Sequence, residues 1–360
     1  MERTRNYGID LLRLVSMFFV VMLHVLAQGG VLENAPGIQY AISWYMEITA
    51  YCAVNCYALI SGYVCYREEE TPYNYAGYLE FWIPVFIYSF GITLAFDIFC
   101  PQIVGSDVLL KSALPVSSAR YWYVNAYTGL FFIIPWLNKL LRTITERQLN
   151  RLVLMLFIIF SVFPTFSNIW TDVFRMYGGY SLAWLVILYV VGAWVKKNKI
   201  DQKKRMFWWL IIIFICIGVT WAEKMLRGNR PSRLVSYMSF IMVIISLGML
   251  VVFSHLKLSR GMISAVKTFS PAAFGVYLIH TQTLVWKYGL KDAFLWIAQS
   301  KAWLLPLEVL GCTLGIFVVC LITEVLRKII FRKLGLDWLI KKIEERCNVA
   351  VGKLVCRICD

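Results

Sequence analysis

Apolar residues in this chain gather into many runs of about the length that crosses a lipid bilayer. The hydrocarbon core of a bilayer is about 30 Å thick, and an α-helix of about 20 residues spans it. A soluble domain scatters its apolar residues between polar stretches and carries about 25% charged residues. Here 16% of the 360 residues are charged and 60% are hydrophobic. We therefore expect an all-α polytopic membrane protein, and the pattern excludes an ordinary cytosolic enzyme.

Ten runs bounded by charged or turn-forming residues are candidate transmembrane helices. The chain has no internal repeat and no low-complexity linker, so we expect one helical bundle over residues 1–330. Residues 331–360 form a basic tail, in which Leu336–Asp360 mixes apolar and charged residues at helical spacing. This spacing predicts a short amphipathic helix on the cytoplasmic leaflet. The ten runs lie near residues 9–28, 40–64, 79–99, 121–138, 152–169, 180–195, 207–223, 234–254, 271–288 and 302–326.

The basic residues predict how these spans are oriented. The formal net charge is +15, and most Lys and Arg residues lie in short segments between the runs. Segments such as 196–205 and the tail after Arg327 are richer in them than the alternate segments. With an even number of spans, the positive-inside rule then places both termini in the cytoplasm and the 29–39 loop outside. The charge reports topology and does not indicate a nucleic-acid partner.

One predicted outer segment carries more positive charge than this rule favours. Lys224, Arg227, Arg230 and Arg233 crowd around Pro231. They either anchor the segment at the lipid interface or form an electropositive mouth for an anionic acceptor, such as the phosphate of a lipid-linked glycan. On the second interpretation, Arg227, Arg230 and Arg233 bind the acceptor.

The ten cysteines show no spacing that would indicate a strong metal site. Most lie in or beside apolar runs, where a free cysteine behaves as a small hydrophobic residue. Cys356 and Cys359 form a lone C-x-x-C near Cys347, without a second pair or a histidine. We therefore expect no metal and no resident cofactor.

The first run contains three ionisable residues, and each such side chain inside a bilayer costs a few kcal/mol. Arg13 and His24 are eleven residues apart, which places them within about 20° of one helix face and about 16 Å apart along the axis. Arg13 then lies near the cytoplasmic boundary, and His24 lies deep in the outer half of the membrane. The alternative for Arg13 is that it snorkels to the inner headgroups with Asp10 as its partner.

Other polar residues within the runs are candidates for supporting roles. Glu47 either orients His24, binds an acceptor, or is a carboxylate at interface depth. Four more also have an ordinary structural explanation, as helix–helix contacts, a buried core histidine or part of an aromatic belt. They are Asn55, Ser61, His280 and Tyr123.

Five segments along the chain form an ordered set of motifs. The first is an arginine, ten further residues and a histidine, from Arg13 to His24. The others are Cys52 to Tyr63, which ends in Ser-Gly-Tyr; Tyr121-Trp122-Tyr123 to Pro135; Gly178 to Ser181 with Gly192-Ala193; and Ser270-Pro271 to His280. Together they resemble the bacterial acyltransferase-3 family of integral membrane enzymes, and the resemblance covers nearly the whole chain.

The resemblance implies transfer of an acyl group, usually acetyl, from cytoplasmic acyl-CoA to a hydroxyl of an envelope polysaccharide, peptidoglycan or lipid-linked sugar. The implied location is the bacterial cytoplasmic membrane. His24 would act as a general base on the acceptor hydroxyl or accept the acyl group itself. Arg13 would pair with phosphate of the donor or hold the helix through Asp10. With Glu47, these two are the candidate catalytic residues.

One feature departs from the family. Many members carry paired arginines at the cytoplasmic start of the third helix, whereas no basic residue occurs from Glu68 to Gln102. Lys139, Arg142 or Arg147 would have to compensate. The alternative function is a non-catalytic exporter or transporter of polysaccharide or glycolipid on the same helices, with substrate sites near broken midplane helices.

Overall fold

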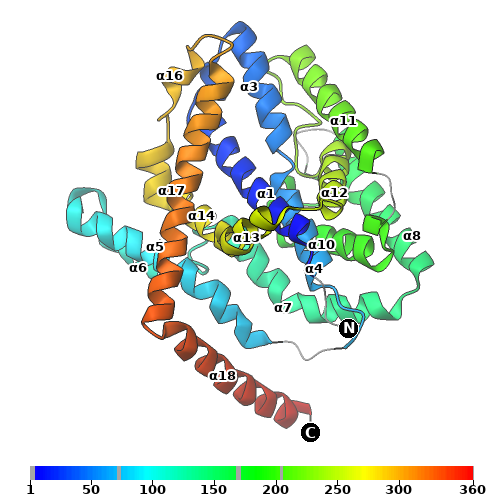
Figure 1. Cartoon of the computed structure of the whole chain (residues 1–360), viewed down its shortest axis with the longest axis vertical. Helices are drawn as coiled ribbons and strands as arrows, with labels where there is room; N and C mark the ends of the chain where they lie inside the picture. Colours follow the sequence, from blue (N-terminus) through cyan, green and yellow to red (C-terminus); the bar gives the residue numbers. More distant parts are fainter. Residues whose placement is uncertain (1–4, 71–73, 168–171, 203–205, 360) are drawn as a thin grey trace.

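A computed structural model describes residues 5–70, 74–167, 172–202 and 206–359, with side chains to residue 349. Every regular element in this part of the chain is a helix (Figure 1). The longer helices are α1 (Tyr7–Leu26), α3 (Gly37–Ala50), α4 (Ala53–Cys65), α5 (Tyr78–Phe99), α6 (Ser106–Ala113), α7 (Trp122–Thr143), α8 (Glu146–Phe157), α10 (Leu182–Lys197), α11 (Met206–Arg227), α12 (Phe240–Ser254), α13 (Arg260–Phe269), α14 (Ala273–His280), α17 (Leu305–Lys333) and α18 (Leu336–Cys359).

Short helical turns connect the longer helices. Four of them are α-helical: α2 (Val31–Asn34), α9 (Phe163–Phe166), α15 (Thr283–Val285) and α16 (Leu295–Ala298). The tighter or wider turns are η1 (Tyr75–Gly77), η2 (Pro101–Ile103), η3 (Ile158–Val162), η4 (Tyr177–Gly179), η5 (Ile200–Gln202), η6 (Ser270–Ala272) and η7 (Trp286–Leu290).

Seven helical stretches in the described residues are long and apolar enough to cross a bilayer. They are Tyr7–Leu26, Gly37–Cys65, Tyr75–Phe99, Glu146–Phe166, Met206–Arg227, Arg260–His280 and Leu305–Lys333. This confirms an all-α, polytopic membrane protein. The count of ten stays a prediction, because α7, α10 and α12, which match three further expected runs, are not among the seven; α10 and α12 have only 16 and 15 residues.

Two expected runs are interrupted. The run at 40–64 becomes α3 and α4, separated by a turn at Tyr51 and Cys52. The prediction of one continuous helix over 271–288 is wrong beyond His280, where the helix ends. There the side chain of Gln282 accepts hydrogen bonds from the backbone N–H groups of Leu284 and Val285, and so starts a new turn.

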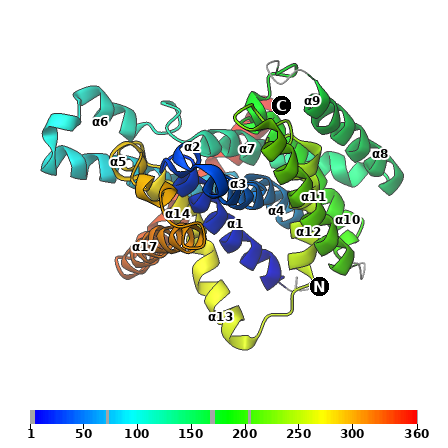
Figure 2. The ribbon, with the colours of Figure 1, turned by 90° about the horizontal axis from the view of Figure 1, so that it is seen from above.

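Helix α1 lies in the middle of the bundle, with α3, α4, α12, α14 and α17 packed around it (Figures 1 and 2). Asn6 caps its first turn by accepting from the N–H groups of Gly8 and Ile9. Because neighbours cover most sides of α1, its polar side chains face protein and not lipid. Contacts with the neighbouring helices offset the free-energy cost of placing ionisable side chains inside the membrane.

Helices α4 and α10 pack closely along their length, and this contact depends on two glycines. A Cβ atom at Gly62 would lie 2.0 Å from the carbonyl oxygen of Tyr189. A Cβ atom at Gly192 would lie 2.1 Å from the carbonyl oxygen of Leu59. Small residues let two helix backbones approach in this way where lipid provides no hydrophobic drive for association.

The tail forms a longer helix than expected. Gly335, with φ of +69°, ends α17 and turns the chain into α18, which projects from the bundle (Figure 1). The Nδ2 group of Asn348 donates to Oδ1 of Asn74 at 2.7 Å, which joins α18 to the η1 segment. The proposed boundary at residue 330 falls inside α17, so the division into bundle and tail stays a prediction.

Candidate active site

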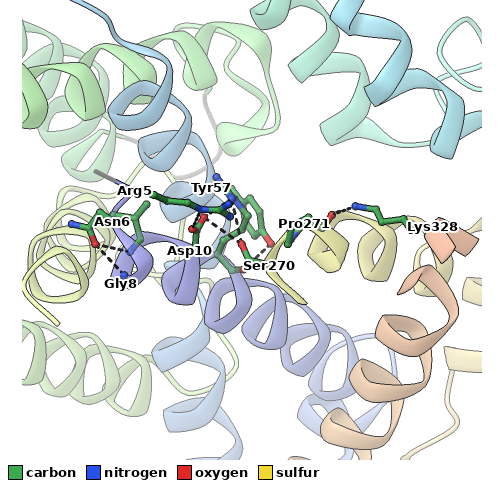
Figure 3. A network of polar contacts seen from close by, with 10 residues as sticks. Arg5, Asn6, Gly8, Asp10, Tyr57, Ser270, Pro271 and Lys328 are labelled. Carbon is green, nitrogen blue, oxygen red and sulfur yellow. Dashed lines mark hydrogen bonds and ion pairs between the residues drawn. The ribbon is translucent and has the colours of Figure 1, made fainter. Parts of the chain in front are cut away.

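A polar network holds Arg13 on α1 (Figure 3). Its Nη1 donates to Oδ1 of Asp10 at 3.1 Å and to Oγ of Ser270 at 3.3 Å. Asp10 also accepts from Nε of Arg5 at 2.5 Å, and this bond raises the pKa of Arg5. The hydroxyl of Tyr57 donates to the Arg13 carbonyl oxygen at 2.8 Å. The Asp10 pairing expected from the sequence is present, and contact of Arg13 with a donor stays a prediction.

The structure brings His24 of α1 against His280 of α14. Nδ1 of His24 and Nε2 of His280 are 2.9 Å apart. Nδ1 of His280 lies 2.5 Å from the carbonyl oxygen of Val276, one turn earlier on the same helix. The ring of Trp286 meets the His24 ring edge-to-face, with 4.7 Å between centroids. His24 is therefore held on two sides.

These contacts define the hydrogen positions when both rings are neutral. A carbonyl oxygen only accepts, so Nδ1 of His280 carries the hydrogen that bonds to Val276. Nε2 of His280 then has a free lone pair and accepts from Nδ1–H of His24. Nε2 of His24 is left without a hydrogen, as a base or nucleophile requires.

His24 lies on the wall of a small cavity of about 70 Å³. His24 is half-buried, whereas its neighbours Leu23 and Val25 are buried. Aromatic side chains from several helices make most of the wall, so the space is water-poor and shaped for a planar or ring-like group. The lining residues are Met17, Val20, Leu23, His24, Val54, Tyr57, Trp122, Tyr123, Tyr180, Tyr237, Phe274 and Tyr277. Tyr123 thus belongs to this wall, although the sequence equally allowed an interface position.

Asn55 positions one side of this cavity. It is fully buried, its Nδ2 donates to the carbonyl oxygen of Tyr237 at 2.8 Å, and its Oδ1 accepts from Nε1 of Trp184 at 3.0 Å. Gly179 has φ of +101°, and a Cβ atom there would lie 2.7 Å from Cβ of Tyr237. Asn55 and Gly179 together fix where the Tyr237 ring stands.

Glu47 is buried on α3, with 5% of its surface exposed. Its Oε2 has no hydrogen-bond partner within the described part of the chain. No hydrogen bond in that part joins it to His24, so the proposed orienting role finds no direct contact. Ser61 donates to the carbonyl oxygen of Tyr57 at 3.0 Å within α4, which is a local helix bond.

The basic loop residues do not line the His24 cavity. Arg227 forms an ion pair with Glu223, and with Arg230 it borders a surface groove on α11. Arg233 borders a separate cavity of about 180 Å³ that also contains Asp172. Acceptor binding by these three arginines stays a prediction.

A larger cavity lies at the other ends of α4 and α7. Its volume is about 850 Å³, and Arg67, Lys139 and Arg142 line it together with Glu70 and Phe131. Two of the three residues suggested as substitutes for the missing paired arginines are therefore present in one cavity.

Sequence reasoning missed two members of the buried polar structure. Trp286 lies in a segment expected to be the end of a span, and only its aromatic character signalled a role. Glu324 resembles a helix-end residue in the sequence but is 2% exposed, bonded to Nε and Nη2 of Arg327 at 2.7 Å each and to the Tyr88 hydroxyl at 2.7 Å.

Within the described residues, no three His, Cys, Asp or Glu side chains gather as metal ligands would. The side chains of Cys356 and Cys359 lie outside the described part, so the expectation of no metal at that motif is not tested there.

A comparison with family models decides the identity of the fold. The model described as an acyltransferase domain matches residues 6–325. The chain belongs to the acyltransferase-3 family. Comparison with curated proteins and with solved structures gave no significant match. The matched range includes the His24–His280 pair, the Arg13 network and both cavities, so the acyltransferase domain coincides with the site described above.

Proposed function

We propose that this membrane acyltransferase moves an acyl group, in the simplest case acetyl, from acyl-CoA to a hydroxyl of an envelope glycan or lipid-linked sugar at the bacterial cytoplasmic membrane. The family supports acyl transfer as the reaction type. One observation carries the finer proposal: His24 stands on the wall of an aromatic cavity and its Nδ1 is 2.9 Å from Nε2 of His280, a contact that assigns the free lone pair of neutral His24 to Nε2. A base in that place suits a reaction that begins by activating a hydroxyl.

The proposed reaction uses one nitrogen of His24 twice. Nε2 takes the proton from the acceptor hydroxyl while the hydroxyl oxygen attacks the carbonyl carbon of the thioester. The carbon–sulfur bond then breaks, and the departing thiolate takes the same proton from the imidazolium. His280 accepts the Nδ1–H bond throughout and stabilises the cation. If Nε2 attacks the thioester first, an acyl-imidazole forms and the hydroxyl displaces it.

The cavity at the other ends of α4 and α7 supports a phosphate-bearing donor. Arg67, Lys139 and Arg142 offer positive charge there, as the phosphates of CoA need. Phe131 lines this cavity and Tyr123 lines the His24 cavity, and eight residues of α7 separate them, a rise of about 12 Å. Arg13 lies about 16 Å from His24 along α1 and contacts Tyr57, which also lines the His24 cavity. An extended thioester arm fits this arrangement.

The test is a transfer assay with the purified full-length protein in lipid nanodiscs. Acetyl-CoA and a panel of 4-nitrophenyl glycosides are supplied, free thiol is measured, and the glycosides are analysed by mass. We expect His24-dependent thiol release with a mass gain of one acetyl group. His24→Ala and His24→Gln should each remove transfer, since neither side chain acts as a base at neutral pH.

A non-catalytic exporter would give a different result. It would release no thiol above background and would move unmodified glycan across vesicles, with His24→Ala changing transport and no covalent product. That outcome would overturn the enzyme proposal.

A further inference from the structure

The middle and the last turn of α3 carry polar groups that the reaction above does not use. Ser43 and Glu47 are four residues apart, as are Glu47 and Tyr51, so the three lie on one side of the helix, one turn apart. Ser43 is fully buried and Glu47 is 5% exposed. Neither Oγ of Ser43 nor Oε2 of Glu47 has a hydrogen-bond partner in the part of the chain that the structure describes.

Burying these polar groups without hydrogen-bond partners costs free energy. A buried hydroxyl or carboxylate that has left water without a new partner costs a few kcal/mol or more. No ion pair in the described residues reaches Glu47, and the buried Lys224 is instead bonded to the carbonyl oxygens of Gly228 and Arg230 at 2.8 and 3.2 Å. A ligand hydroxyl both donates and accepts a hydrogen bond, so the hydroxyls of one ligand would supply partners to both Ser43 and Glu47.

This side of α3 is connected to the His24 cavity by a series of aromatic ring contacts. Tyr51 stacks on Tyr237 with 4.7 Å between centroids, and Tyr237 lies 5.2 Å from Tyr180. Tyr180 in turn meets Trp122 at 4.5 Å. Tyr180, Tyr237 and Trp122 all line the cavity.

We propose that Ser43 and Glu47 form a hydroxyl-binding site for the acceptor, next to the His24 cavity and toward the α2 end of the bundle. The ligand class is a polyhydroxylated ring: its C–H face packs on the Tyr237 and Tyr180 rings, one hydroxyl donates to Oε2 of Glu47, and a neighbouring hydroxyl bonds to Ser43. Glu47 precedes Val54 of the cavity wall by seven residues, across the turn at Tyr51 and Cys52. A second group of hydroxyl contacts beside the cavity would select glycans over simple alcohols. The inference rests on the proposed function, because it assigns the acceptor side of the same reaction.

The experiment compares Glu47→Gln and Ser43→Ala with the unchanged protein in nanodiscs. The acceptors are a 4-nitrophenyl disaccharide and cyclohexylmethanol, which offers one hydroxyl and no others. For Glu47→Gln we expect the KM of the disaccharide to rise about 3- to 10-fold, the value of one hydrogen bond to an uncharged group. For Ser43→Ala we expect a rise of a few fold. The KM of acetyl-CoA should stay within about twofold, and transfer to cyclohexylmethanol should fall much less than transfer to the disaccharide.

Glu308→Gln is the matched control. Oε2 of Glu308 is also buried without a partner in the described residues, but Glu308 lies on α17 and does not line the cavity. Its disaccharide KM should not change. An unchanged disaccharide KM in Glu47→Gln, or an equal loss of transfer to both acceptors, would overturn the proposed site.

A binding measurement keeps this result separate from the enzyme proposal. Saturation-transfer difference NMR with the disaccharide alone, in the absence of donor, should show contact of the sugar protons with the unchanged protein and a weaker signal with Glu47→Gln. If the unchanged protein shows no His24-dependent thiol release, the proposed function fails, while this binding result still decides on the Glu47 site. Equal signals from the two proteins reject the site whether or not acyl transfer occurs.

Discussion

His24 and His280 are chemically alike but have different surroundings, and this separates their roles. His24 is half-buried on the cavity wall, whereas His280 is 2% exposed and bonded on both ring nitrogens. On the proposed function, His280 would act through His24 as a positioning residue. Arg13 is likewise bound on one side by Asp10, which itself holds Arg5.

The role of His280 predicts a loss of rate without a loss of binding. His280→Ala should lower kcat about 10- to 100-fold, the usual effect of removing a residue that orients a functional histidine, and leave both KM values within about twofold. Initial rates at varied donor and acceptor concentrations measure this. The control is His255→Ala, since His255 bonds to the Val251 carbonyl oxygen at 2.8 Å and lines no described cavity. If kcat were unchanged and the whole fall in kcat/KM came from a higher KM, the positioning role would be rejected.

Arg13 and Asp10 give a second prediction. We expect Arg13→Lys to raise the KM of acetyl-CoA severalfold with little effect on that of the glycan, because lysine lacks the planar group that pairs with phosphate at two points. Asp10→Asn should instead lower stability by about 1–3 kcal/mol, because it weakens bonds to both Arg5 and Arg13. Donor kinetics and thermal unfolding of the two variants decide this. Normal donor kinetics for Arg13→Lys would remove Arg13 from the donor site.

Local periodicity was enough to predict the shared face of Arg13 and His24, because a helix repeats every 3.6 residues. The same reasoning could not predict the bond from His24 to His280, since 256 residues separate them and only tertiary packing joins them. Glu47 was recognisable as a costly intramembrane carboxylate, but its lack of a partner emerges only from the packed helix.

Among the elements, the tight α4–α10 pair is sensitive to substitution at two glycines. Its backbones meet at Gly62 and Gly192, which have no room for a side chain. The span containing α4 also carries Val54 and Tyr57 of the His24 cavity. A change at this contact therefore affects both folding and the site.

We expect Gly62→Ala and Gly192→Ala each to reduce the yield of folded protein and the unfolding temperature, because the new methyl group would lie about 2 Å from a carbonyl oxygen. Size-exclusion profiles in detergent and thermal scans measure the effect. Gly218→Ala on α11 is the control, since a Cβ atom there meets no atom within 4 Å. An unchanged unfolding temperature for Gly62→Ala would contradict this prediction, because it would show that α4 and α10 can move apart with little loss of free energy.

Hydropathy predicted most of the elements, because apolar runs report burial in lipid directly. It could not locate the breaks at Tyr51 or after His280. These depend on a turn and on the Gln282 cap, which are side-chain and backbone hydrogen bonds inside an equally apolar sequence. The amphipathic α7 was expected as a run at 121–138, and its helix extends to Thr143.

For the whole molecule, the polytopic helical fold and the family were accessible from the sequence, because composition and ordered motifs are both global properties. The central position of α1 could not be predicted from the sequence, since any long apolar helix is stable in lipid. Only its contacts with neighbouring helices distinguish α1 from the others. Orientation in the membrane stays a prediction from charge.

That orientation is directly testable. In a cysteine-free background, Glu33→Cys should react with a membrane-impermeant maleimide added to intact cells, and Ile200→Cys should react only after the cells are opened. The positive-inside rule places the basic 196–205 segment in the cytoplasm. Labelling of residue 200 from outside would contradict the topology and, with it, the assignment of donor and acceptor sides.

The wide separation of His24 and His280 along the chain also has a consequence for biogenesis. A ribosome that has inserted α1 must make more than 250 further residues before α14 arrives to accept the Nδ1–H bond of His24. Throughout that time His24 lacks its partner on α14, and Arg13 lacks Ser270. If the proposed mechanism holds, thioester cleavage would become possible only late in synthesis, which would protect the cellular pool of activated acyl groups from unfinished chains.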